Sequence, residues 1–225
     1  MKPHSSRNRY LLSVIFVFAF TTTASAQYKL ESSAAPPPQE LAGGIRDALS
    51  PTGIEVTGPG GPLCEIWLAK SVPTAATPDT SLGVNFGQIP QGALVGAMKL
   101  GAKNNDYRNQ PIEPGVYALR FMLEPVDGNH QGVSPYRDFL LAVPAALDTS
   151  AQPITTDSLL KLSRKASGTG HPSIWSLVPA DTAPATLPGI AHQDDGDLWV
   201  VFFQAPLSTP LKMGLVVFGH AQEPE

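Results

Sequence analysis

Short apolar runs alternate with clusters of turn-forming residues along most of the chain after residue 53. The runs include GIEVTG, LCEIWLAK, ALVGAMKL, GVYALRFMLEP, DFLLAVP, SIWSLVP, DLWVVFFQAP and LKMGLVVFG. Runs of this length that are rich in Val, Ile, Phe and Trp and bounded by Gly, Pro, Asn or Asp are typical of β-strands. The pattern therefore predicts an all-β fold, and specifically an antiparallel β-sandwich of the Ig-like or transthyretin-like kind.

Several of these runs are apolar on both faces. In residues 198–204 (LWVVFFQ), both alternating sets of positions are hydrophobic. A strand of this kind is covered on both sides, so the sheet needs a second sheet on one side and loops or a partner on the other. We therefore expect the side chains of Tyr117, Phe121, Trp199 and Phe202 to be buried.

Only one segment has the pattern of a helix. Residues 157–165 (DSLLKLSRK) carry three leucines with helical spacing and basic residues in the last turn. Thr155 or Thr156 precedes them as a candidate N-cap, and Gly168 follows. The sequence predicts one short helix in an otherwise β protein.

The first 26 residues have the three parts of a secretory signal peptide. Three basic residues precede an uncharged apolar run at 10–20, and the sequence Ala-Ser-Ala closes the segment at residue 26. The run is too short to cross a bilayer, which needs about 20 apolar residues. We expect cleavage before Gln27, a periplasmic or secreted protein, and no membrane span after cleavage, with an uncleaved anchor as the alternative.

The rest of the chain divides into a lead-in and one domain. Residues 27–48 are rich in Ala, Pro, Ser and Gly, a composition that favours a flexible or extended segment. We expect this flexible lead-in to be followed by a single β-sandwich domain over residues 49–225.

Charge limits the classes of partner. Three of the 15 basic residues and none of the 19 acidic ones lie in the first 26 residues, so the remaining chain would have a net charge of −7 with histidine neutral. Nucleic-acid affinity comes largely from neutralising phosphates with basic residues. We therefore expect no nucleic-acid partner, and the acidic balance also disfavours anionic membrane surfaces.

A short turn carries a family resemblance. Residues 114–117 (PGVY) lead directly into an apolar strand, and this PGxY turn resembles turns of carboxypeptidase-regulatory and transthyretin-like β-sandwich modules. Over its whole length, with PVDGNHQGVSPYRDFLLAVPA as the distinctive part, the chain resembles uncharacterised exported bacterial β-rich proteins. The resemblance implies a fold and no activity.

The loop between two of the expected strands is the first candidate site. It brings together five side chains that could bind a ligand: Asp127, His130, Tyr136, Arg137 and Asp138. We favour a structural interpretation, in which the loop is a hairpin or sheet crossing held by an ion pair between Arg137 and a carboxylate. Under this interpretation His130 is dispensable, whereas a binding site would need it.

Histidines at three positions are the candidates for a metal site: His130, His171 and His192. They have no H-x-H or H-E-x-x-H spacing, so a divalent metal would require convergence through the fold. No other cofactor is predicted.

The acidic stretch at 192–200 resembles part of a calcium loop but lacks the EF-hand spacing and its final Glu, and we interpret it as a turn. Cys64 is expected to be a small buried hydrophobic residue.

Two classes of function remain open. No nucleophile-elbow or phosphate-loop motif is present, which favours an exported non-catalytic binding or interaction protein of the cell envelope. Its partner would be a protein, an envelope component or a carbohydrate, bound by exposed aromatics and loops at one end of the sheets. The alternative is a metal-dependent or hydrolytic periplasmic enzyme with His and Asp residues carried on loops. Convergence of the three histidines would favour the enzyme.

Overall fold

The computed structural model describes residues 27–126, 134 and 136–221. Its fourteen strands and α-helices are, in chain order, β1 Lys29–Ser33, α1 Gly43–Ala48, β2 Gly53–Gly58, β3 Gly61–Leu68, β4 Leu94–Leu100, β5 Asn104–Asn105, β6 Pro111–Ile112, β7 Gly115–Leu123, β8 Asp138–Pro144, α2 Thr156–Ser167, β9 Ile174–Val178, β10 Gly189–Gln193, β11 Leu198–Ala205 and β12 Leu211–Phe218. Short 3-10 turns cover Ala145–Leu147 and Ala180–Thr182.

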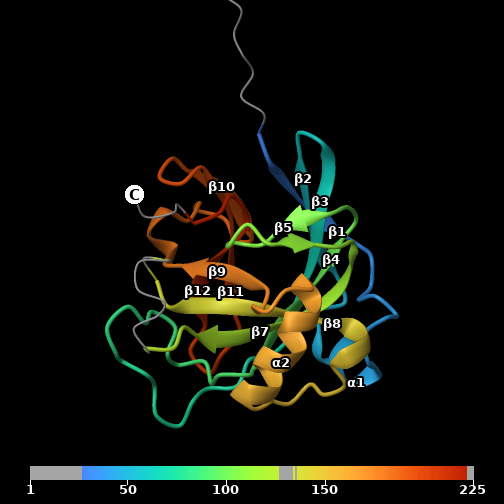
Figure 1. Ribbon diagram of the computed structural model, residues 1–225. Helices are drawn as coiled ribbons and strands as arrows, with labels where there is room; N and C mark the ends of the chain where they lie inside the picture. Colours follow the sequence, from blue (N-terminus) through green and yellow to red (C-terminus); the bar gives the residue numbers. More distant parts are fainter. Residues whose placement is uncertain (1–26, 127–133, 135, 222–225) are drawn as a thin grey trace, which may run out of the picture.

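Ten strands form one antiparallel sheet in the order β1-β2-β3-β4-β7-β8-β9-β12-β11-β10. The sheet bends until its two edge strands, β1 and β10, come close together, so that it is nearly barrel-shaped (Figure 1). Strands β5 and β6 form a separate small hairpin. The prediction of an all-β antiparallel fold is confirmed. Because one continuous sheet curls round on itself, the predicted pair of stacked sheets is not confirmed.

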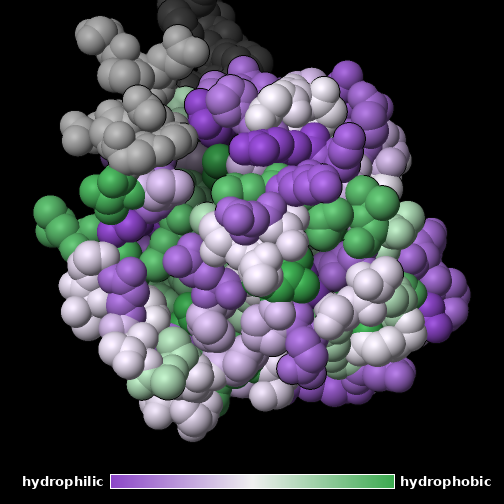
Figure 2. Space-filling view, turned by 60° about the horizontal axis from the view of Figure 1, so that its bottom comes forward, coloured by the Kyte–Doolittle hydropathy of each residue, from purple (hydrophilic) through white to green (hydrophobic). Residues whose placement is uncertain are grey.

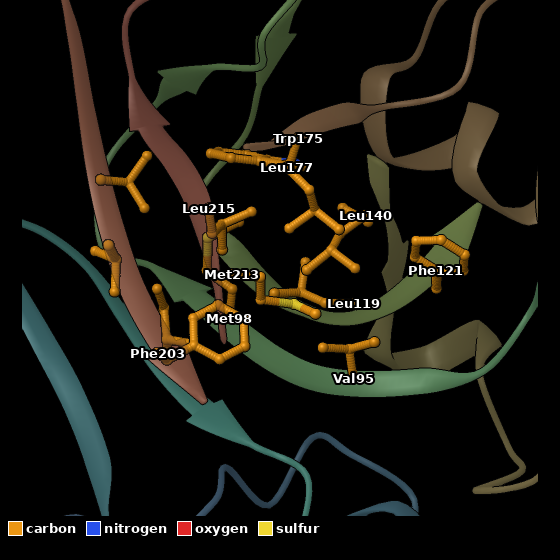
Figure 3. Packing of buried hydrophobic residues seen from close by; sticks show 14 of the residues in the cluster. Val95, Met98, Leu119, Phe121, Leu140, Trp175, Leu177, Phe203, Met213 and Leu215 are labelled. Carbon is orange, nitrogen blue, oxygen red and sulfur yellow. The ribbon is translucent and has the colours of Figure 1, made fainter. Parts of the chain in front are cut away.

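The interior of the bent sheet is a continuous apolar core. Phe203 and Met213 point from one side of the bend toward Leu119 and Leu140 on the other (Figure 3). The alternate positions of β11 face outward and are buried in a second cluster beneath the connections that flank the sheet. This two-sided burial explains the doubly apolar pattern of residues 198–204.

The aromatic residues expected in the core lie there. Phe121 and Phe202 are completely buried, and Tyr117 and Trp199 are nearly so, which confirms that prediction. Cys64 is buried as expected, and burial raises the pKa of its thiol to about 12.

Helix α2 forms where the sequence predicts it. The hydroxyl of Thr155 caps its first turn by accepting a bond from the Ser158 N–H, and Gly168 follows the last turn with a φ of 66°. The buried Leu159 packs on β7 and β8. In the part of the chain that the structure describes, no helix is long and apolar enough to cross a membrane.

The prediction of a flexible lead-in does not hold for much of residues 27–48. Strand β1 pairs with β2 along its whole length, and helix α1 buries Ile45. The Trp67 indole donates a 2.9 Å hydrogen bond to the carbonyl oxygen of Ala35, so the proline-rich stretch is also bound to the sheet. The composition of this segment resembles that of a linker, but its few apolar side chains are enough to anchor it.

Candidate functional site

The loop that joins β7 and β8 is a hairpin connection. Leu123 and Asp138 are directly paired across the two strands. Asp127 and His130 lie outside the described residues, so only Tyr136, Arg137 and Asp138 of the five candidate residues can be placed.

Arg137 holds the base of this hairpin. Its Nη2 and Nε donate to the carbonyl oxygen of Glu124 at 2.8 and 3.1 Å, and its Nη1 donates to Ser81 Oγ at 2.9 Å. The Arg137 N–H also bonds to the Gly83 carbonyl. Among the described residues, the guanidinium group bonds to carbonyl oxygens and a hydroxyl, and no carboxylate is among its partners. Every residue has a carbonyl oxygen, so the sequence could not identify the Glu124 carbonyl as the partner of Arg137.

Asp138, the residue after Arg137, also has a structural role. It is fully buried, and its carboxylate accepts bonds of 2.9 Å each from the backbone N–H groups of Asn85 and Phe86. Burial raises the pKa of this carboxyl, although the hydrogen bonds oppose the shift. Tyr136 packs at the edge of the outer apolar cluster. Arg137 and Asp138 therefore tie the hairpin to the long segment before β4, and the structural interpretation of the whole loop stays a prediction.

Replacing Arg137 with alanine is expected to lower the free energy of unfolding by about 1–3 kcal/mol, because the Glu124 carbonyl loses both of its guanidinium donors. Chemical denaturation measures this loss. The matched variant His130→Ala should leave stability and metal content unchanged. A metal lost in His130→Ala, with Arg137→Ala as stable as the parent, would contradict the structural interpretation of the loop.

The two candidate histidines that the structure describes, His171 and His192, belong to different surroundings. His192 lies on β10, where its Nε2 is 2.7 Å from Asp197 Oδ1 and its ring centroid is 4.9 Å from that of Trp199. His171 follows α2 and lines a pocket with Arg108 and Arg164. Among residues 27–126, 134 and 136–221 there is no group of three or more His, Cys, Asp or Glu side chains that could hold a metal ion.

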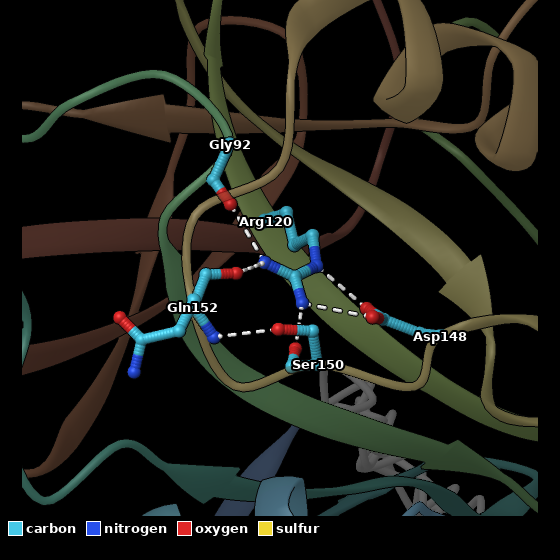
Figure 4. A network of polar contacts seen from close by, with 5 residues as sticks. All are labelled: Gly92, Arg120, Asp148, Ser150 and Gln152. Atoms are coloured by element: carbon cyan, nitrogen blue, oxygen red, sulfur yellow. Dashed lines mark hydrogen bonds and ion pairs between the residues drawn. The ribbon is translucent and has the colours of Figure 1, made fainter.

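The buried polar network around Arg120 has no free guanidinium donor for a ligand. Arg120 on β7 directs all five of its guanidinium N–H groups to protein acceptors (Figure 4). Two of these bonds go to the Asp148 carboxylate and three to backbone carbonyls. Because every donor is used, this network stabilises the fold and is not a candidate binding site.

A pocket of about 340 Å³ near the end of β12 has a different character. We call it the asparagine pocket. It is lined by Asn104, Asn105, Asn109, Gly196, Asp197, Phe218, Gly219 and His220. Three segments that are far apart in the sequence build it: the β5–β6 hairpin, the β10–β11 turn and the end of β12 with the two residues after it.

Asp106 fixes the hairpin that supplies the three asparagines. It is almost completely buried, and its carboxylate accepts bonds from the N–H groups of Arg108, Gln110 and Ile174 at 2.9–3.0 Å. The bond from Ile174 attaches the hairpin to β9. Burial raises the pKa of this carboxyl, and the hydrogen bonds act against that shift. The asparagines are thus presented on a rigid support.

Two residues lining the asparagine pocket have left-handed backbone conformations, which residues other than glycine rarely adopt. Asn109 has a φ of 59° and Asp197 a φ of 50°. Such conformations cost free energy and persist where the surrounding structure imposes them, often at binding sites. Here they direct a carboxamide and a carboxylate to the same pocket.

The pocket offers both hydrogen-bonding and apolar surface. Asn104 Nδ2 is buried and has no hydrogen-bond partner among the described residues, whereas Asn105 Nδ2 donates to Asn109 Oδ1 at 2.8 Å. Phe218 is 39% exposed, and its ring centroid is 4.9 Å from that of Tyr28. A buried amide without a partner is costly, and a turn of the Asn104 side chain toward the pocket would let a ligand accept its hydrogen bond.

The sequence did not indicate the three asparagines as site residues. Three asparagines within six residues (NNDYRN) are a visible cluster, but nothing local in the sequence indicates that they meet Asp197 and Phe218. Comparisons with protein-family models, curated proteins and solved structures find no match to this chain.

Proposed function

We propose that the protein is an exported, non-catalytic binding protein of the cell envelope that binds a neutral carbohydrate in the asparagine pocket. The observation that carries this proposal is the convergence of three asparagines, one with an unpartnered buried amide, beside an exposed phenylalanine. The signal-peptide pattern of the first 26 residues supports export.

The chemistry of the pocket suits a sugar. Each carboxamide both donates and accepts hydrogen bonds, as does each sugar hydroxyl. The Asp197 carboxylate accepts bonds from hydroxyls and repels anions, which favours a neutral ligand. Phe218 supplies an apolar surface for the C–H face of a sugar ring. The volume of about 340 Å³ is near the lower end of small-molecule pockets, which suits one or two sugar units.

The position of the pocket also supports binding. Its side chains come from strand ends and the loops beside them, and β-sandwich modules such as antibody domains bind ligands with loops at one end of their sheets. A functional likeness to Ig-like or transthyretin-like modules is part of this proposal. The rigid sheet fixes the loops, so binding requires little reordering of the chain.

A glycan array first identifies the neutral sugars that the purified protein binds. Titration calorimetry of two variants with these sugars then tests the proposal. Phe218→Ala should weaken binding about tenfold through lost ring contact. Asn109→Gly keeps the left-handed backbone while removing the amide, and should weaken binding about three- to tenfold. Leu82→Ala, at a residue that is 95% exposed and does not line the pocket, is the control and should bind like the parent.

Two results would contradict the proposal. One is the absence of binding to any neutral glycan, and the other is binding that both pocket variants leave unchanged. A stoichiometric metal in protein purified without chelators would instead favour the enzymatic alternative.

A further inference from the structure

A second pocket, of about 240 Å³, lies between α2 and strands β7–β9. We call it the arginine pocket. It is lined by Arg108, Met122, Leu123, Glu124, Pro125, Phe139, Leu141, Leu160, Arg164, His171, Pro172 and Ile174. On the face shown in Figure 2, patches of hydrophobic residues (green) lie among hydrophilic side chains (purple).

The floor of the arginine pocket is apolar and well ordered by packing. Met122 on β7 and Phe139 and Leu141 on β8 are buried core residues that belong to two of the hydrophobic clusters. Leu160 on α2 and Ile174 on β9 are partly buried beside them. This floor offers an apolar surface to a ligand without any change in the sheet.

The rim of the pocket is mainly basic. Arg164 lies four residues after Leu160, one turn further along the same face of α2, and Arg108 comes from the β5–β6 hairpin. No ion-pair or side-chain hydrogen-bond partner of Arg108, Arg164 or His171 is found in the described part of the chain. Glu124 also lines the pocket, and its carbonyl oxygen is bonded by Arg137. Two arginines and a histidine thus outnumber one carboxylate.

This arrangement stands out in a protein whose formal net charge is −4. Arg108 and Arg164 line the same pocket, and no ion pair of either guanidinium group with a described carboxylate is found, so both are available to an external anion. A guanidinium group binds a carboxylate through two parallel hydrogen bonds. The apolar floor beside it accommodates an apolar tail.

We propose that the arginine pocket binds a small amphipathic anion, with its carboxylate on Arg108 and Arg164 and a short aliphatic tail on the floor formed by Met122, Phe139 and Leu141. The volume is below the usual range of about 300–1,000 Å³ for small-molecule pockets, so the tail is short. This inference does not depend on carbohydrate binding in the asparagine pocket, which is lined by different residues.

The two pockets share one support. Arg108 and Asn109 are consecutive, yet each lines a different pocket, and Asp106 anchors the hairpin that carries both. A ligand in one pocket therefore contacts the same rigid hairpin as a ligand in the other.

Titration of the purified protein with octanoate tests the inference, with 1-octanol, octylammonium and acetate as matched probes. Octanoate should bind more tightly than each of the other three, because only octanoate combines the anionic head with the tail. Arg164→Glu should weaken octanoate binding about tenfold or more through loss of a charged hydrogen bond and added repulsion. Lys165→Glu makes the same change in charge at the next residue, outside the pocket, and should leave affinity within about twofold.

Several outcomes would overturn the inference. Equal affinity for octanol and octanoate would exclude recognition of the anion, and equal affinity for acetate would exclude the tail. Equal weakening by Arg164→Glu and Lys165→Glu would indicate a diffuse charge effect. Binding to phosphatidylglycerol vesicles without binding of free octanoate would indicate a membrane surface in place of a pocket ligand.

Discussion

Replacing Arg120 with methionine is expected to lower the free energy of unfolding by about 3–5 kcal/mol. Arg120 is completely buried, and its Nε and Nη2 lie 2.6 and 2.8 Å from the two Asp148 carboxylate oxygens. The same guanidinium bonds to the carbonyl oxygens of Gly92, Ser150 and Gln152 (Figure 4). Methionine fills much of the volume but leaves a buried carboxylate without a cation.

Urea denaturation of three variants separates this effect from a general loss of packing. The double variant Arg120→Met/Asp148→Leu should recover part of the loss, since it removes the uncompensated charge. Lys103→Met breaks an ion pair whose side chains are 59% and 70% exposed, and should change stability by less than about 1 kcal/mol. A loss below about 1 kcal/mol in Arg120→Met would show that the network does not stabilise the fold.

Replacing Phe202 with alanine is also expected to cost about 3–5 kcal/mol, since truncating a buried aromatic loses transfer free energy and leaves a cavity. Phe202 is 0% exposed on β11 and faces the outer apolar cluster. Its cross-strand partner is Gly214, and the Phe202 ring fills the space above that glycine. Gly214 itself has no side chain to fill the cavity.

Chemical denaturation measures this loss, and Gln204→Ala provides the control. Gln204 lies two residues further along the same strand and is exposed, so its replacement should change stability by less than about 0.5 kcal/mol. Equal stability of Phe202→Ala and the parent would contradict the assignment of β11 as a strand covered on both faces.

The strands could be predicted because their pattern is local. The doubly apolar run at 198–204 indicates burial on both faces, and the capping threonine and closing glycine define α2 within a few residues. Closure of the sheet depends on which strand edges approach one another across the whole chain, and no local pattern encodes that. The edge strand β1 was missed because its sequence, KLESS, is mostly polar and exposed, so its backbone pairing with β2 has no hydrophobic pattern.

The candidate sites were harder to predict for the same reason. The density of polar residues near Arg137 drew attention to a loop whose described residues bond mainly to backbone, whereas the asparagine pocket combines residues 104–109, 196–197 and 218–220. Arg120 was visible as a single charge in an apolar strand. Its partner Asp148 lies beyond the next strand, so the pair becomes evident only in the folded chain.

The most direct test of the proposed carbohydrate site is an NMR titration of the purified protein with its best-binding neutral sugar, observing side-chain amide and aromatic signals. The carboxamide signals of Asn104, Asn105 and Asn109 and the ring signals of Phe218 should shift together and saturate at one dissociation constant. Saturable shifts confined to other residues, with these four unchanged, would contradict carbohydrate binding in the asparagine pocket.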